Sequence, residues 1–123
     1  MSHIVTTSIE IKNQGCLEKA SQQCGLVNLG VKRHELFNSQ HAHGLGIKLA
    51  DWKYPAVIDL TTGAVKYDNY GGSWGKQIEL DKLVQRYTAN VAIEQADING
   101  YQYYEETLEN GDIKLNMTQL QTA

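Results

Sequence analysis

Hydrophobic positions recur along the chain with a period of two in most places and with a helical period in two others. A period of two is typical of a strand with one buried face, because successive side chains point to opposite sides of the sheet. The first such run covers residues 4–11, and the alternation returns several times before the end of the chain. The predicted strands are residues 4–11, 27–32, 45–49, 56–60, 64–67, 101–105 and 113–117.

Turn-forming residues separate the predicted strands. Thr61-Thr62-Gly63 joins two of them in a compact hairpin, and Asn110-Gly111 joins the last two. Asn-Gly is typical of a type I′ turn, in which both central residues have positive φ. Between the second and third strands we expect a polar loop over residues 38–44.

Two segments have helical periodicity instead. In the first, Asn13 is a suitable N-cap and Gly25 a suitable C-terminal residue with positive φ, so a short helix lies between them. We expect Leu17 and Cys24 of this helix to point into the core. The second helix spans residues 76–98, and its apolar stripe predicts one buried face. The stripe consists of Leu80, Leu83, Val84, Tyr87, Val91 and Ile98.

The predicted order of elements is therefore β-α-β-β-β-β-α-β-β, in a single domain over residues 1–123. Amphipathic helices bury their stripes against a sheet, and strands that alternate favour antiparallel pairing. We predict an α+β fold, a two-layer sandwich in which a mostly antiparallel sheet carries both helices on one face. The expected architecture is ferredoxin-like with extra central strands. The order of the strands in the sheet stays open.

Charge and composition narrow the classes of function. The formal net charge is −3, and the densest basic group is only Lys32-Arg33-His34, so nucleic-acid binding is not expected. Cys16 and Cys24 lie too far apart along a helix to form a disulfide with each other. No secretory signal and no apolar run of about 20 residues is evident, which predicts a cytoplasmic protein outside the membrane.

The most unusual composition lies between Tyr67 and Gly75, where aromatic residues alternate with glycines. Aromatic rings offer faces for a planar ligand, and the N-terminal amides of the following helix attract anions. This pattern indicates a nucleotide-like ligand, although the P-loop signature is missing. The alternative is an ordinary strand-to-helix turn in which Trp74 caps the core. The candidate ligand-binding residues are Tyr67, Asn69, Tyr70, Gly71, Gly72, Ser73, Trp74 and Lys76.

A second candidate surface is the tyrosine-rich strand near the end of the chain. Tyr101, Tyr103 and Tyr104 fall within four residues, and tyrosines exposed on a strand are typical of protein interfaces. We expect them to dock a partner protein or a second copy of the chain in a homo-oligomer. The alternative is an edge strand whose tyrosines cover the core, because strands favour tyrosine in any case.

Histidines suggest a third, weaker candidate. His41 and His43 would point to the same side of a strand, and Asp51 follows a little later in the chain. Two imidazoles and a carboxylate are ligands that zinc accepts, but no recognised zinc spacing is present. The alternative is a solvated polar loop. No catalytic residue is assigned, and no cofactor is expected.

Four short segments carry a family resemblance. They are Met1-Ser2-His3, Ala50-Asp51-Trp52, Gln85-Arg86-Tyr87, and the ending from Gly100-Tyr101 through Glu105-Glu106 to Asn110-Gly111-Asp112-Ile113-Lys114-Leu115. In these the chain resembles a family of small hypothetical proteins of unknown function found in cyanobacteria, algal plastid genomes and phages. The resemblance implies a cytoplasmic or stromal setting and a phage source, and it brings no catalytic residues that transfer to this sequence.

Two hypotheses of function follow. The first is a non-catalytic binding module that holds a small, nucleotide-like ligand or, if phage-encoded, a host protein. The second is a small metal-dependent enzyme that uses His41, His43 and Asp51. The first is preferred, because no arrangement of acid, base and nucleophile typical of catalysis is present.

Overall fold

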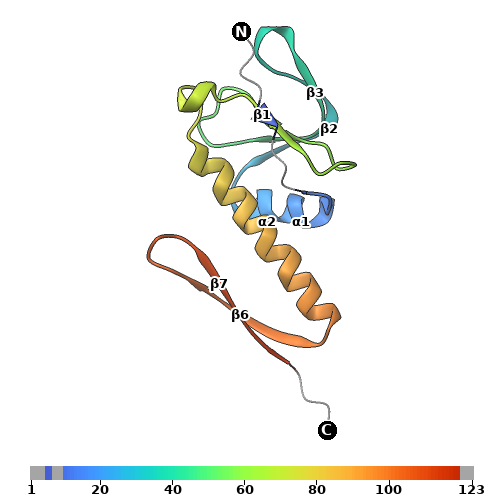
Figure 1. Cartoon of the computed structure of the whole chain (residues 1–123), viewed down its shortest axis with the longest axis vertical. Coiled ribbons are helices and arrows are strands. Elements are labelled where there is room, and N and C mark those ends of the chain that lie inside the picture. The colour runs from blue at the N-terminus through green and yellow to red at the C-terminus, as the bar shows by residue number, and fades with distance from the viewer. Residues whose placement is uncertain (1–4, 7–9, 120–123) are drawn as a thin grey trace.

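The computed structural model of the chain describes residues 5–6 and 10–119. Its strands and helices follow the predicted order, with two short 3-10 helices added (Figure 1). Residue 4 and residues 7–9 of the first predicted strand lie outside the described residues. The main sheet contains β1 (Val5–Thr6), β2 (Val27–Glu35), β3 (His41–Lys48), β4 (Ala56–Ile58) and β5 (Val65–Tyr67). The other elements are α1 (Gln14–Gln23), η1 (Phe37–Ser39), η2 (Tyr70–Gly72), α2 (Gln77–Ile98), β6 (Tyr101–Thr107) and β7 (Ile113–Gln119).

The main sheet has the strand order β1-β5-β4-β3-β2, and every described pair of neighbours is antiparallel. The predicted α+β class, with a mostly antiparallel sheet and two helices, is confirmed. Among the described residues, β6 and β7 pair with each other alone and form a second sheet. The chain therefore consists of a helix-covered sheet followed by a separate hairpin.

Both helices pack on one face of the main sheet. The strand registers place Leu45 opposite Ile58 and Ile58 opposite Val65, so these side chains share a face. With Leu17 of α1 and Leu83 of α2 they belong to one buried cluster. Figure 1 shows α1 and the first half of α2 on the same side of the strands. This two-layer core supports the segments that contain the candidate sites.

The ends of α1 confirm the predicted signals, whereas one of its core residues was predicted wrongly. Asn13 is the N-cap and accepts a hydrogen bond from the amide of Cys16 at 3.0 Å, and Gly25 follows with φ +70°. Cys24, predicted to be buried, is exposed, and Cys16 is buried instead. The helix ends at Gln23, so Cys24 lies in its C-cap and no longer follows the helical stripe.

The β2–β3 hairpin is longer than predicted. The expected polar loop over residues 38–44 is wrong in its second half, because β3 already begins at His41 and pairs with Glu35. The ring of buried His34 lies against Gly46 of β3, where a Cβ atom would come within 2.5 Å of it. A cross-strand fit of this kind depends on tertiary packing, and hydrophobic periodicity does not reveal it.

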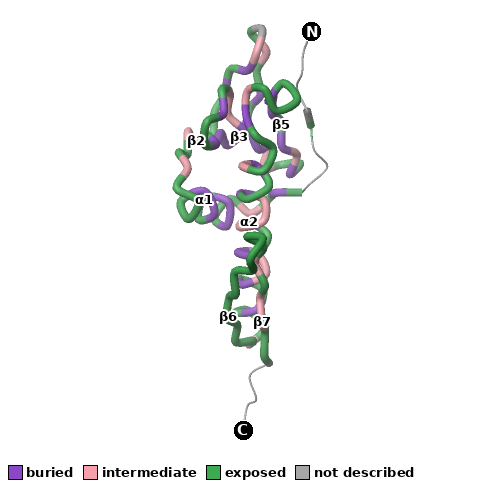
Figure 2. The backbone as a smooth tube through the Cα atoms, turned by 90° about the vertical axis from the view of Figure 1, so that its left-hand side faces the viewer, coloured by how far each residue is buried: buried purple, intermediate pink, exposed green. Residues whose placement is uncertain are grey.

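Helix α2 begins and ends within one residue of its prediction, but it contacts two different sheets. Its 22 residues span about 33 Å, so the helix is longer than the part of it that packs on the main sheet. Figure 2 shows β6 and β7 running beside the remaining length of the helix, away from the main sheet. Small residues such as Ala89 and Ala92 line the space between α2 and Leu115 of β7. Ile98, predicted to extend the buried stripe, is 69% exposed because the core has ended before it.

The hairpin turn forms where predicted but has a different geometry. The amide of Gly111 donates to the carbonyl of Leu108 at 2.9 Å, and the amide of Leu108 donates to the carbonyl of Asp112 at 2.8 Å. Only Gly111 of the described turn residues has positive φ, at +88°. These features belong to a three-residue loop with a bulge, and the expected type I′ turn is wrong.

Candidate functional site

The segment between β5 and α2 contains two residues that the protein uses internally. Tyr67 is buried, and its hydroxyl donates to the side-chain oxygen of Gln77 at 3.4 Å. Asn69 is buried too, and its amide donates to the carbonyl of Gly75 at 3.3 Å. These contacts fasten the segment to the start of α2. Tyr67 and Asn69 thus face the interior, although both were candidates for ligand binding.

The aromatic residues of the same segment gather in a cluster around Trp74, which we call the Trp74 cluster. Tyr70 stacks on Trp74 with ring centroids 4.7 Å apart and an interplanar angle of 26°. Phe37 and Tyr54 contact the same indole with centroid distances of 4.9 and 5.6 Å. The ammonium of Lys53 lies 4.7 Å from the indole centroid. A planar ligand stacking on Trp74 would therefore have to displace a side chain of the protein.

Sequence reasoning found Tyr70 and Trp74 but missed their three neighbours. Phe37 comes from η1, while Lys53 and Tyr54 come from the loop before β4. The amide of Lys53 donates to the carbonyl of Trp74 at 2.8 Å, which fixes the two loops against each other. No local pattern in the sequence indicates this pairing, because the two segments are far apart along the chain.

A hollow of about 240 Å³ lies at the N-terminus of α2. Ser73 and Lys76 line it and favour an anion, and Lys76 is an N-cap whose side chain makes no capping hydrogen bond. Asp51 and Glu79 also line the hollow, and their negative charges oppose an anion. With one lysine against two carboxylates, the lining side chains carry a net negative charge, which does not favour a phosphate.

The glycines of this segment have conformational and packing roles. Gly71 and Gly72 have φ of +61° and +104°, a region that side chains rarely adopt. Gly75 lies so close to the ring of buried Trp52 that an added Cβ would come within 2.5 Å of it. The alternative interpretation of an ordinary strand-to-helix turn accounts for all three.

The histidine candidates do not come together with Asp51. His41 and His43 are exposed on β3, and Arg33 of β2 donates to Nδ1 of His41 at 3.0 Å. From His43 to the end of β3 at Lys48 the strand runs about 17 Å. Asp51 follows beyond that end. Among the residues that the structure describes, no three His, Cys, Asp or Glu side chains converge on one point as metal ligands would.

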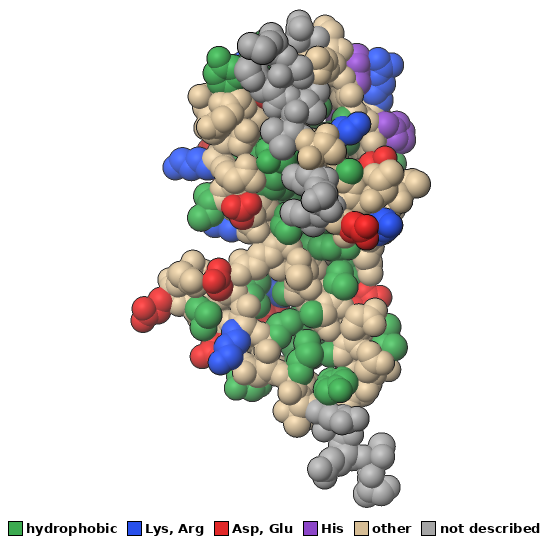
Figure 3. Space-filling view, in the orientation of Figure 1, with side chains coloured by type: hydrophobic (Ala, Val, Ile, Leu, Met, Phe, Trp, Pro, Cys, Tyr) green, Lys and Arg blue, Asp and Glu red, His purple; other side chains and the backbone are tan. Residues whose placement is uncertain are grey.

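The tyrosine-rich strand presents a different picture, because its tyrosines face solvent. Tyr101, Tyr103 and Tyr104 are 37%, 40% and 64% exposed. Tyr103 pairs across the hairpin with Met117, which is also exposed. Figure 3 shows hydrophobic side chains spread over the part of the surface that α2 and the hairpin form. The alternative, that these tyrosines cover the core, does not fit their exposure.

A shallow hollow of about 600 Å³ accompanies these tyrosines. Besides the three tyrosines it contains one carboxylate, Asp97, from the last turn of α2. Sequence reasoning missed Asp97, because helical periodicity marks it only as an exposed position. The lining residues are Asp97, Tyr101, Gln102, Tyr103, Tyr104, Asn116 and Thr118.

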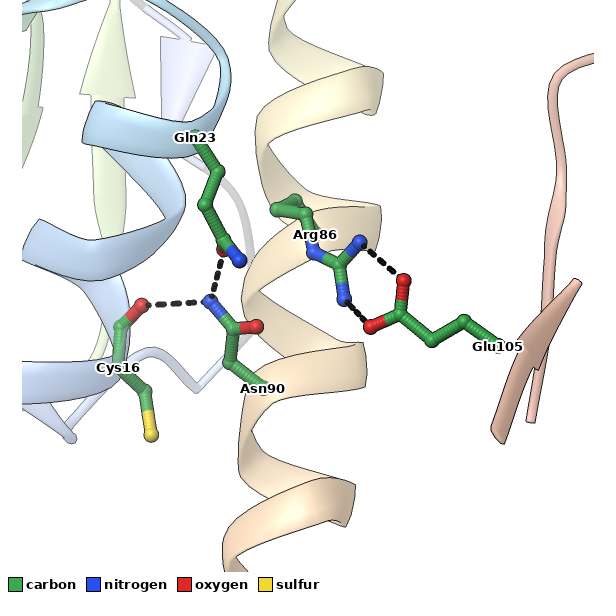
Figure 4. Close-up of polar contacts among 5 residues, drawn as sticks. All are labelled: Cys16, Gln23, Arg86, Asn90 and Glu105. Atoms are coloured by element: carbon green, nitrogen blue, oxygen red, sulfur yellow. Dashed lines mark hydrogen bonds and ion pairs between the residues drawn. The ribbon is translucent and has the colours of Figure 1, made fainter. Parts of the chain in front are cut away.

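An ion pair fixes the hairpin to α2. Both terminal nitrogens of Arg86 donate to the carboxylate of Glu105, at 2.5 and 3.0 Å (Figure 4). The paired guanidinium lowers the pKa of Glu105 below its ordinary value, chiefly through the hydrogen bond. One turn further along, buried Asn90 donates to the carbonyl of Cys16 and to Gln23 of α1. The same stretch of α2 therefore holds α1 on one side and β6 on the other.

Cys16 is not set up as a nucleophile. Its thiol donates to a carboxylate oxygen of Glu94 at 2.9 Å. Burial, together with this hydrogen bond and the charge of Glu94, raises the pKa of Cys16 to about 11. A nucleophilic thiolate needs the opposite shift.

No protein-family model, no curated protein sequence and no solved structure matches the chain. The resemblance to small proteins of cyanobacteria, plastids and phages therefore stays a prediction. Within the described residues, neither helix combines the length and the apolar composition that crossing a membrane requires.

Proposed function

We propose that the protein is a non-catalytic binding module and that the β6–β7 hairpin is the surface on which it docks another protein. One observation carries this proposal. Tyr101, Tyr103 and Tyr104 are exposed on a hairpin that extends beyond the main sheet, and Tyr103 pairs with exposed Met117. Tyrosine is enriched in protein interfaces, because one ring combines a large apolar area with a hydroxyl.

The architecture of the hairpin supports the same function. An isolated pair of strands is only marginally stable in water, and every described residue of β6 is exposed. The Arg86–Glu105 pair and half-buried Ile113 and Leu115 hold one face of the hairpin against α2, so the opposite face, which carries Tyr104, stays available. Contact with a partner explains why the chain contains a long, exposed aromatic hairpin, because large exposed apolar patches mark interaction sites.

The other two candidates have weaker support. In the Trp74 cluster, Tyr70 and Lys53 already contact the indole, and the hollow at the start of α2 contains carboxylates. A nucleotide-like ligand therefore finds neither a free stacking face nor a clearly positive pocket. The metal-dependent enzyme would need His41 and His43 to meet a third ligand, and the described residues supply none nearby.

Site-specific photo-crosslinking tests the proposal. A photoreactive phenylalanine analogue replaces Tyr104 in the full chain, which is then irradiated in extract from its natural source. We expect a discrete protein adduct, identified by mass spectrometry, that is lost when unlabelled wild-type protein competes. The matched control places the same analogue at Ile78, an exposed apolar residue in the first turn of α2. Equal adducts from both positions, or none from Tyr104, would contradict the docking function.

A further inference from the structure

The charges of the chain are unevenly distributed. Residues 97–119 contain five carboxylates and one basic residue, Lys114, whereas residues 1–96 contain nine carboxylates and ten lysines or arginines. The negative charge of the protein is therefore concentrated in the hairpin and the last turn of α2. Arg86 neutralises one of the five by pairing with Glu105. The exposed carboxylates of Asp97, Glu106 and Glu109 have no ion pair with a described residue.

The hollow beside β6 combines this charge with aromatic faces. It is lined by three tyrosines and by Asp97, and no lysine or arginine lines it. A tyrosine face attracts a cation through its quadrupole, and a guanidinium can stack on the ring while it pairs with a carboxylate. The site therefore suits an arginine or lysine side chain better than an acidic or purely apolar one.

The backbone of the hairpin suits an extended chain. In a two-stranded sheet, every second residue of each strand directs its N–H and C=O groups away from the partner strand. The described residues contain no third strand that pairs with those outward groups of β6. A peptide that adds to such an edge gains backbone hydrogen bonds, and its alternate side chains reach one face of the sheet.

We propose that the occupant of the hairpin is an extended, arginine- or lysine-rich segment of another protein, with a cationic side chain that lies on Tyr104 and pairs with Asp97. This proposal rests on the docking function proposed above and specifies the chemistry of the partner. The segment lies along β6, so its charge and its extended shape are both recognised.

Fluorescence anisotropy with defined peptides tests the proposal. The probe is a labelled ten-residue peptide that alternates arginine with valine or threonine, and its matched control has citrulline in place of every arginine. Citrulline keeps the shape but removes the charge, together with two of the five N–H donors, because an oxygen replaces one guanidinium nitrogen. We expect the arginine peptide to bind at least about tenfold more tightly. We also expect its binding to weaken as salt rises from about 0.05 M to about 0.3 M.

Variants of the protein locate the binding. Asp97→Asn and Tyr104→Ser should each weaken the arginine peptide several-fold, because each removes one of the proposed contacts. Asp81→Asn, an exposed carboxylate nearer the start of α2, makes the same charge change far from the hollow and should leave the affinity unchanged. Circular dichroism of each variant checks that the fold is intact.

Three results would overturn the proposal. One is equal affinity for the arginine and citrulline peptides, and another is no binding of either. The third is that the purified chain sediments as an oligomer and that Arg33→Gln converts it to a monomer. In that case the β2–β3 tip of a second copy would be the occupant. If peptides fail while Tyr104 still crosslinks a partner in extract, the docking function stands and only the partner's chemistry is wrong. If that crosslink is lost as well, both the docking function and the proposed chemistry of the partner are wrong.

Discussion

The guanidinium of Arg86 in α2 holds the carboxylate of Glu105 in β6 through two parallel hydrogen bonds. The side chain of Arg86 is only 14% exposed, so the pair lies between helix and hairpin rather than on open surface. A planar guanidinium that meets both carboxylate oxygens fixes orientation as well as distance. Together with the packing of Ile113 and Leu115, this contact therefore sets the orientation of the tyrosine-bearing strand relative to α2.

Replacing Glu105 with glutamine should loosen the hairpin without unfolding the main sheet. The neutral amide keeps the shape but loses the charge, and we expect the free energy of opening the hairpin to fall by about 1 kcal/mol. Hydrogen exchange measures this as faster exchange at residues 101–119, with no change in β3 and β4. Glu106→Gln, the neighbouring residue without an ion pair, serves as control. Equal effects of both substitutions would show that Arg86 does not anchor the hairpin.

The same pair predicts a loss of hairpin order in acid. Because the folded pKa of Glu105 is depressed, its ionised form stabilises the hairpin at pH values above the ordinary glutamate pKa of 4.5. That stability is lost as the pH falls below 4.5 and through the lower, folded pKa. Chemical shifts of the β6 amides should follow this titration. The pKa values of Asp59 and Glu94 are lowered too, so these groups also titrate in acid. The control is Glu105→Gln, and only the part of the titration that this substitution abolishes is assigned to Glu105.

The two cysteines should differ sharply in their reaction with iodoacetamide. Cys24 is exposed, whereas Cys16 is buried, donates to Glu94 and has its pKa raised to about 11. At pH 8 the native protein should be alkylated first at Cys24, and Cys16 should react only after denaturation. Peptide mapping by mass spectrometry measures the order. Similar rates at both thiols in the native state would contradict the described packing of α1 against α2.

Gly75→Ala should cost much more stability than Gly71→Ala. At Gly75 the new methyl group meets the ring of buried Trp52, a clash that we expect to cost about 2–3 kcal/mol. At Gly71 the methyl group meets no atom within 4 Å, and the cost of about 1 kcal/mol comes from its positive φ. Urea denaturation compares the two free energies of unfolding. The reverse order would mean that Trp52 does not pack against the start of α2.

Much of the secondary structure was predictable, because its signals lie within a few residues. The capping side chain of Asn13 and the glycine at position 25 bracket α1, and the apolar stripe of α2 stops within one residue of its observed bounds. Alternation located the strands of the main sheet in the same way. The prediction for Cys24 was wrong because Cys24 lies in the C-cap of α1, where the helical stripe no longer applies.

The candidate sites were less predictable, because they depend on which distant segments meet. Phe37 and Lys53 reach Trp74 from two other loops, and Asp97 reaches the tyrosines of β6 from the end of α2. The proximity of Tyr67 and Trp74 in sequence suggested one shared site, yet Tyr67 is buried at the end of β5. Composition identifies unusual residues, but it does not say whether a neighbour already occupies their surface.

By itself, the sequence determined the type and order of the elements, the hairpin signals and the concentration of tyrosine and negative charge near the end of the chain. Those properties depend on the spacing of side chains along a few turns or strands. Only the tertiary structure decided that β6 and β7 leave the main sheet and expose their tyrosines along α2. That outcome depends on where the core ends along α2 and on the contact of Arg86 with Glu105, and a local pattern shows neither.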